Sequence, residues 1–355
     1  TSNLPIVLLD DHGYGTPVDS GTGLYTTTLL YVFEPAGGIA TLNSAPSFSS
    51  RAGFRIRGRT SATFPKRGYG LETWNEKDAD LKVPLLGLPA ESDWVFSNPY
   101  KYDDVFIHNA FIFEVSRRIG RWAPRTRLAE VFANVNGGKL DYTDYSGVYE
   151  ICEKIERGGN RLDIAELGAE AMSGDALTGG YIFKIDQLDP GEVGWTTPRN
   201  IKPVVVEPDV TSAEVDQAAP STFNPVKKAQ VDYLKAYVNA FETTLYAERN
   251  TNFATRNYRK YIDVPSWIDH SLLEILAFNV DAFTLSAYFH KDRNGKINAG
   301  PIWDFDRALN SDDGRDANPR QWNGMNIAPD WWGQLLSDPD YVQALVDRWW
   351  ELRKG

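Results

Sequence analysis

The sequence has almost no cysteine and little histidine. Only Cys152 is a cysteine among the 355 residues, so the chain can form no internal disulfide and no cysteine-based zinc site. The four histidines are scattered along the chain, which argues against a histidine-rich metal site. No apolar run approaches the roughly 18 residues that a membrane-spanning helix needs, so we expect no membrane span.

The chain also lacks a surplus of positive charge. Its 37 lysines and arginines are outnumbered by 48 aspartates and glutamates, which gives a formal net charge of −11. Proteins hold nucleic acids through a basic face, so we expect no nucleic-acid partner, while a local anion site remains open. The 11 tryptophans, 17 tyrosines and 17 phenylalanines indicate bulky cores or a surface that stacks on rings.

Hydrophobic periodicity predicts mostly strands in the first part of the chain and helices in the second. We expect strands over residues 4–10, 24–33, 51–59, 68–74, 128–135, 145–155 and 181–185, and helices over residues 102–120, 226–247, 266–290 and the last 15. We expect a loop region over 187–225 and a hairpin turn over 291–296, which leads into a short strand over 301–306. This distribution is typical of an α+β fold.

A run of cationic side chains is the first candidate for chemistry. Arg55, Arg57 and Arg59 alternate with other residues, so they project from one face of the predicted strand. They repel one another unless an anion or carboxylates face them, and the nearby Ser61 and Lys66 suit a phosphate. The alternative interpretation is a solvated strand face that pairs with acidic residues.

Three aspartates in the second half are the other candidates. Asp281 lies inside an apolar segment, where a carboxylate is costly to bury unless it is hydrogen-bonded or binds a metal. Asp304 and Asp306 lie one residue apart in a predicted strand and so share a side, which suits a hard divalent cation. The alternatives are a turn-capping role for Asp281 and a polar strand end at 304–306.

The candidate residues occur in the same order along the chain as the functional residues of kinase-type phosphoryl-transfer enzymes. Such enzymes use a lysine on the nucleotide phosphates, an aspartate at the acceptor hydroxyl, and a later aspartate that holds Mg²⁺. Lys66, Asp281 and Asp304 occur in that order.

Six short motifs resemble those of the CotH family, the spore-coat-protein-H-like atypical protein kinases, and the resemblance covers roughly residues 4–310. They are Arg57-Gly-Arg59-Thr-Ser61 with Pro65-Lys66, Leu85-Leu-Gly-Leu-Pro89 with Asp93-Trp94, Asp104 with Asn109, Gly147-Val-Tyr149 with Glu153-Lys154, Asn279-Val-Asp281, and Pro301-Ile-Trp303-Asp304-Phe305-Asp306. The resemblance implies one atypical protein-kinase-like domain over residues 1–355. Its β-rich N-terminal lobe would cover 1–185, and its mainly helical C-terminal lobe 186–355, with the expectation that this lobe is cut short at its C-terminus.

The resemblance also implies cofactors, partners and roles. It implies ATP and Mg²⁺, a protein substrate or a cell-surface or extracellular component as partner, and a location on spores, at cell surfaces or outside the cell. The implied roles are nucleotide binding for Arg57, Arg59, Lys66 and Glu153, catalysis for Lys66 and Asp281, and metal binding for Asp304 and Asp306. Glu114 is the alternative to Glu153 as the partner of Lys66.

Two departures from kinase patterns keep other functions open. Ser286 stands where protein kinases have an asparagine five positions after the catalytic aspartate, and no G-x-G-x-x-G loop is present. One alternative is a catalytically weak surface- or glycan-binding module of the same fold, in which Trp331-Trp332 or Trp349-Trp350 stack on sugars. The other is a polysaccharide hydrolase that uses two of the three aspartates as its carboxylate pair.

Overall fold

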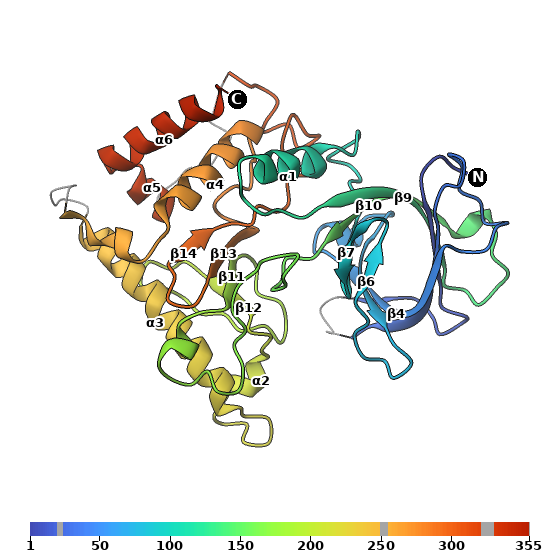
Figure 1. The fold of residues 1–355 in the computed structure, drawn as a ribbon, viewed down its shortest axis with the longest axis horizontal. Helices are drawn as coiled ribbons and strands as arrows, with labels where there is room; N and C mark the ends of the chain where they lie inside the picture. The colour runs from blue at the N-terminus through green and yellow to red at the C-terminus, as the bar shows by residue number, and fades with distance from the viewer. Residues whose placement is uncertain (20–23, 249–254, 321–329, 355) are drawn as a thin grey trace. The chain divides into compact units, whose positions relative to one another are not determined.

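A computed structural model describes residues 1–19, 24–248, 255–320 and 330–354. The chain forms two compact units, Thr1–Phe106 with Pro124–Lys154, and Ile107–Ala123 with Ile155–Gly355. The first unit consists mainly of strands, and the second consists of helices around a small sheet (Figure 1). This confirms the predicted α+β class and the β-rich N-terminal part. The boundary between the two predicted lobes was placed at residue 185, whereas the chain passes between the two units after residues 106, 123 and 154.

Seven strands of the first unit close into a ring, in the order β4-β3-β1-β9-β10-β8-β5, because β5 pairs back onto β4. The strands are β1 (Ile6–Asp10), β3 (Thr26–Phe33), β4 (Phe48–Arg57), β5 (Gly68–Trp74), β8 (Asp93–Ser97), β9 (Thr126–Asn134) and β10 (Tyr145–Glu153). Neighbours are antiparallel except β1 and β9. The short β2 (Val18–Asp19) pairs with β4, and β6 (Val83–Leu85) pairs with β7 (Leu88–Glu91).

The alternation of apolar residues sets which side of each strand is buried. In β4, Ala52, Phe54 and Ile56 belong to the core of the ring, while Arg55 and Arg57 on the opposite face are half-buried. The predictions for β1, β3, β4 and β5 are confirmed to within a few residues. Strands β6 and β7 were not predicted, because prolines and a glycine interrupt the alternation between residues 83 and 91. Strand β8 was not predicted either.

The second unit contains a four-stranded antiparallel sheet in the order β12-β11-β13-β14. Its strands are β11 (Tyr181–Ile185), β12 (Pro203–Glu207), β13 (Ala287–Lys291) and β14 (Ile297–Ala299), and its helices are α1 (His108–Arg118), α2 (Ser212–Val215), α3 (Pro225–Ala247), α4 (Val264–Ala277), α5 (Trp331–Leu335) and α6 (Pro339–Leu352). The prediction of a continuous loop over 187–225 is therefore wrong at β12 and α2. Among the described residues, no helix has both the length and the apolar character that a membrane crossing requires.

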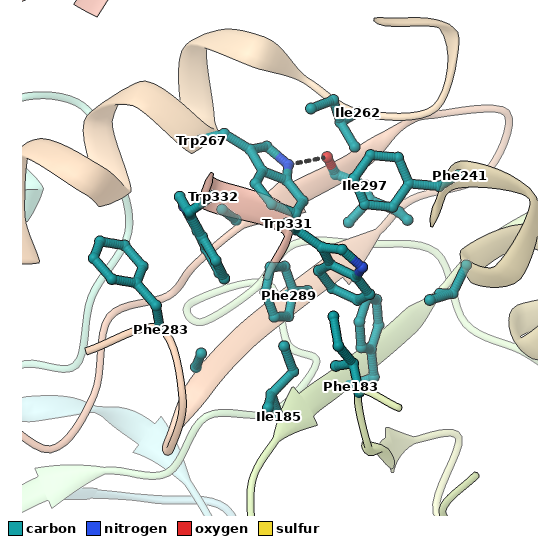
Figure 2. Close-up of a cluster of buried hydrophobic side chains, with 14 of the residues drawn as sticks. Phe183, Ile185, Phe241, Ile262, Trp267, Phe283, Phe289, Ile297, Trp331 and Trp332 are labelled. Atoms are coloured by element: carbon teal, nitrogen blue, oxygen red, sulfur yellow. Dashed lines mark hydrogen bonds between the residues drawn. The ribbon is translucent and has the colours of Figure 1, made fainter. Parts of the chain in front are cut away.

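Many of the tryptophans pack into the core of the second unit. Trp267 of α4 and the pair Trp331-Trp332 of α5 are almost fully buried and surround Phe289 of β13 (Figure 2). The indole Nε1 of Trp267 donates a hydrogen bond to the carbonyl of Ile297 at 3.0 Å. The alternative in which Trp331-Trp332 stack on sugars is therefore excluded for this pair, since both rings are covered by protein, and the core interpretation of the aromatic residues is confirmed for it.

The predicted helix over 266–290 is wrong in its second half. Helix α4 ends at Ala277, because Phe278 adopts a left-handed φ of 52° and its N–H turns back onto the carbonyl of Glu274. Residues 279–286 then form a loop, and the apolar residues after it form β13. An apolar run alone does not distinguish a buried helix from a buried strand.

The predicted strand over 301–306 is also wrong. The strand that follows the 291–296 hairpin turn is β14, which ends at Ala299, and residues 301–306 are not part of any strand. Asp304 has a φ of 66°, which breaks an extended backbone. Strand geometry therefore does not place the side chains of Asp304 and Asp306 on one side. Other contacts bring these two residues together.

Candidate active site

Asp281 lies in the loop between α4 and β13 and faces two arginines. Its Oδ1 accepts a hydrogen bond from Nη2 of Arg315 at 3.1 Å, and its Oδ2 lies 3.9 Å from Nε of Arg307. Asp313 contacts both guanidinium groups and so ties them together. The carboxylate of Asp281 is therefore held by opposite charge, and the turn-capping alternative does not describe it.

Asp306 lies close enough to both Asp304 and Asp281 to interact with them electrostatically. The exposed Asp304 accepts a hydrogen bond from Oγ of Ser286 at 3.0 Å through its Oδ2. Burial raises the pKa of Asp306 well above its ordinary value, and the charges of Asp304 and Asp281 raise it further. The structure thus gathers the three predicted carboxylates in one part of the second unit.

Helix α1 holds the segment that carries Asp304 and Asp306. The side-chain oxygen of Asn109 accepts a hydrogen bond from the backbone N–H of Phe305 at 2.8 Å. Nδ1 of His108 lies 3.2 Å from the carbonyl oxygen of Asp306. The first turn of α1 therefore holds the backbone of residues 304–306 in place. Pairing with a neighbouring strand, which the sequence had suggested, is not what holds it.

The backbone around the carboxylates is strained. Between residues 278 and 310, the non-glycine residues with positive φ are Phe278, Phe283, Ser286, Asn294 in the hairpin turn, Asp304, Leu309 and Asn310. Such conformations cost about 1–3 kcal/mol each and persist only where the surrounding structure enforces them, most often at functional sites. This clustering independently marks the same region as the carboxylates do.

Asp304 and Asp306 are the predicted ligands of a hard divalent cation. Among the residues that the structure describes, no three histidine, cysteine, aspartate or glutamate side chains are arranged to hold a metal ion. Mg²⁺, however, is commonly held by one or two carboxylates, with water and substrate phosphates completing its shell. Asp304 and Asp306 supply two carboxylates, and a cation would offset the charges of Asp304 and Asp281, which add to burial in raising the pKa of Asp306.

Lys66 lies in the first unit, against β10. Its Nζ donates a hydrogen bond to the carbonyl of Val148 and lies 4.7 Å from the ring centroids of both Tyr149 and Phe106. Gly147 leaves room for the lysine stem, since a Cβ there would lie 3.4 Å from Cε of Lys66. Burial lowers the pKa of Lys66 to about 8. A partly desolvated ammonium of this kind attracts anions more strongly than one in water.

The arginines near Lys66 do not all share one strand face. Arg57 ends β4, and Gly58 then adopts a φ of 95°, so the exposed Arg59 lies beyond the strand. Arg55 stacks on the ring of Tyr25, with its guanidinium carbon 4.5 Å from the centroid. The expected row of three arginines is thus reduced to Arg55 and Arg57.

Glu153 is fully buried and bound by Arg125. The Nε and Nη2 of Arg125 donate to its two oxygens at 2.9 and 2.8 Å, and the backbone N–H of Arg125 adds a third hydrogen bond. Lys66 makes no ion pair with any described residue of the first unit. Glu114 of α1 pairs with two arginines of its own helix. The choice between the two glutamates as the partner of Lys66 stays a prediction.

Arg307, Arg315 and Asp313 were not identified from the sequence. Arg307 directly follows Asp306, which is a local signal, but nothing in the sequence indicates that Arg315 returns to Asp281 across 34 positions. The segment around Arg315 is rich in aspartate and glycine and is typical of a solvated turn.

A family model described as CotH kinase protein matches residues 54–355, a range that includes Lys66, Glu153 and the three aspartates. No match is found among the curated proteins.

Proposed function

Because the chain belongs to the CotH kinase protein family, we propose that it transfers a phosphoryl group from ATP to a hydroxyl of a protein substrate, on an atypical protein-kinase-like two-lobed fold. The observation that carries this proposal is the gathering of Asp281, Asp304 and Asp306, in which Asp306 has a raised pKa. Phosphoryl transfer asks little covalent chemistry of the protein and depends on positioning and charge neutralisation. A cluster of carboxylates with two adjacent arginines suits that requirement.

The proposal assigns one role to each group. Asp281 accepts the proton of the acceptor hydroxyl, while Arg307 and Arg315 offset negative charge beside it. Asp304 and Asp306 hold Mg²⁺, which when bound neutralises the phosphates. Lys66 binds the nucleotide phosphates through its positive charge. Arg57 and Arg59 have the same proposed role, which rests on the resemblance to the family.

We also propose a location at a spore coat or another surface, outside the cell. Family membership supports this location, because the family takes its name from a spore-coat protein. Fractionation of the source cells with an antibody to the chain tests it. Recovery in the soluble cytosolic fraction alone contradicts it.

Labelling with γ-³²P-ATP and Mg²⁺ tests the transfer itself. The protein is incubated alone and with a hydroxyl-rich acceptor such as casein, and compared with Asp281→Asn and Asp304→Asn. Asp281→Asn is expected to lose about 100-fold or more of the labelling rate, the usual contribution of a positioned general base. Asp304→Asn is expected to lose labelling because it removes a proposed Mg²⁺ ligand. Asp312→Asn is the matched control, since Asp312 is exposed and belongs to the same part of the chain. Equal labelling by all four proteins, or none by the wild type, contradicts the proposal.

A thermal-shift measurement with Mg-ATP separates transfer from a module that has kept only the fold. A nucleotide at 100 times its dissociation constant stabilises the folded state by about 2.7 kcal/mol. We expect a shift with Mg-ATP and none with oligosaccharides. A shift with oligosaccharides alone supports the glycan-binding alternative, for which the half-exposed Trp350 is the remaining stacking surface.

A further inference from the structure

The side chain of Asp281 is 29% exposed, whereas its neighbours in the first half of the loop are almost fully buried. Val280, Ala282 and Phe283 are each at most 3% exposed, and Asn279 is 4% exposed. Phe278 and Phe283 both have positive φ, so the loop cannot hold this shape by intrinsic preference. Specific contacts must therefore keep the loop in place.

Asn279 makes those contacts with its main chain and its side chain. Its backbone N–H donates to the carbonyl of Glu274 in α4 at 3.1 Å, and its carbonyl accepts from the N–H of Ala282 at 3.2 Å. Its side-chain oxygen accepts a hydrogen bond from the backbone N–H of Asp281 at 3.2 Å. Asn279 thus joins the end of the helix to the backbone of Asp281.

The chemistry of this position suits an amide better than a carboxylate. The pKa of the buried carboxyl of Glu274 is raised to about 8, mainly because burial disfavours its charged form. A hydrogen bond from the Asn279 side chain acts in the opposite direction and favours the charged form. Asp304 lies near enough to raise the pKa of Glu274 as well. An amide offers an acceptor to Asp281 and a donor to Glu274 at once, whereas a carboxylate here would add negative charge to a buried acidic region.

We propose that Asn279 is a positioning residue that sets the direction of the Asp281 carboxylate through the backbone of Asp281, with Glu274 as its buried support. This inference rests on the proposed function, since it concerns how Asp281 performs its role. Asn279 does not itself touch the reacting groups. Loss of its side chain is expected to disturb the turnover step and to leave nucleotide binding intact.

Steady-state kinetics of Asn279→Ala and Asn279→Asp test the proposal. For Asn279→Ala we expect a fall of about 10- to 100-fold in kcat, the cost of a misplacement of about 1 Å, with the KM for ATP within about twofold of wild type. Asn279→Asp keeps the acceptor for the Asp281 N–H and is expected to recover part of kcat. Val280→Ala is the matched control, because it removes buried volume from the same loop without removing a hydrogen bond.

The double variant Asn279→Ala with Asp281→Asn shows whether Asn279 acts through Asp281. We expect this variant to have the kcat of Asp281→Asn alone, because a displaced side chain costs nothing once its carboxylate is gone. Additive losses overturn the proposal, as does a kcat for Asn279→Ala equal to that of wild type. Melting temperatures of all variants identify any loss that comes from unfolding.

Hydrogen exchange gives a readout that does not depend on activity. In peptides covering 278–286, exchange is expected to be faster in Asn279→Ala than in wild type and Val280→Ala. It is expected to be intermediate in Asn279→Asp, which keeps the acceptor for the Asp281 N–H but adds a buried negative charge. Unchanged exchange in Asn279→Ala overturns the inference even if the enzyme transfers phosphate. A wild-type protein without phosphotransfer contradicts the proposed function instead, and the exchange data still decide whether Asn279 holds the loop.

Discussion

Nη2 of Arg315 lies 3.1 Å from Oδ1 of Asp281, so the aspartate assigned to the acceptor hydroxyl already has a cationic partner. Arg307 approaches the other oxygen of the same carboxylate, and Asp313 contacts both arginines. These positive charges share the region with Asp304 and Asp306 and therefore affect any cation that binds there.

Removing Arg315 is expected to strengthen Mg²⁺ binding. A guanidinium beside the carboxylates repels a divalent cation, so Arg315→Ala should raise Mg²⁺ affinity about tenfold, which corresponds to about 1.4 kcal/mol. Calorimetric titration with Mg²⁺ measures this, with Arg315→Lys expected to behave as wild type because it keeps the charge. Arg320→Ala, which removes an exposed arginine nearby, is the control. Weaker Mg²⁺ binding in Arg315→Ala contradicts this electrostatic account.

Nucleotide binding is expected to weaken as the pH rises through about 8. Burial lowers the pKa of Lys66 to about 8, so its ammonium loses its charge above that pH and attracts phosphates less. Well above that pKa the charged fraction falls about tenfold per pH unit. Dissociation constants for ATP, measured between about pH 7 and 9.5 at constant ionic strength, test this. Lys66→Arg stays charged over the whole range and should show a flatter profile, whereas equal slopes would contradict the prediction.

Local pattern predicts much of this fold, and it fails where long-range contacts decide. Strand β5 was predicted over residues 68–74 and β11 over residues 181–185, because their alternation and boundaries are local. The helix predicted over 266–290 failed because Phe278 takes a left-handed conformation, which side-chain hydrophobicity does not encode. The closing of β5 onto β4 has no local signal at all.

The site was predictable in its residue types and not in its geometry. Asp304 and Asp306 were expected to meet through a strand, yet Asn109 of α1 fixes the backbone between them from almost 200 positions away. Arg315 reaches Asp281 across a segment that is typical of a solvated turn. Glu153 was expected to serve the nucleotide, and its burial against Arg125 depends on the register of β10 against β9, which spacing alone does not fix.

Glu153→Gln is expected to destabilise the protein more than it affects nucleotide binding. Glu153→Gln removes the charge from one side of an ion pair whose glutamate is buried and whose arginine is 33% exposed, so the free energy of unfolding should fall by about 1–3 kcal/mol. Denaturant unfolding measures this, with Asp78→Asn as a control, because the pair of Asp78 with Arg51 is exposed and contributes about 1 kcal/mol or less. A KM for ATP that rises tenfold without loss of stability would instead favour a direct role of Glu153 at the nucleotide.

Without Mg²⁺, Asp306 is expected to make stability fall as the pH rises. Its pKa in the folded state lies well above the value of about 3.9 in the unfolded chain, because of burial and then the charge of Asp304. Its contribution is therefore fully present below about pH 4 and is lost as the pH rises through the folded-state pKa. In EDTA, the free energy of unfolding of wild type should decline over this range more steeply than that of Asp306→Asn, and Mg²⁺ should flatten the wild-type curve by neutralising the carboxylates. Asp312→Asn controls for loss of an exposed carboxylate, and parallel curves for wild type and Asp306→Asn in EDTA would show that Asp306 is already ionised in the folded protein.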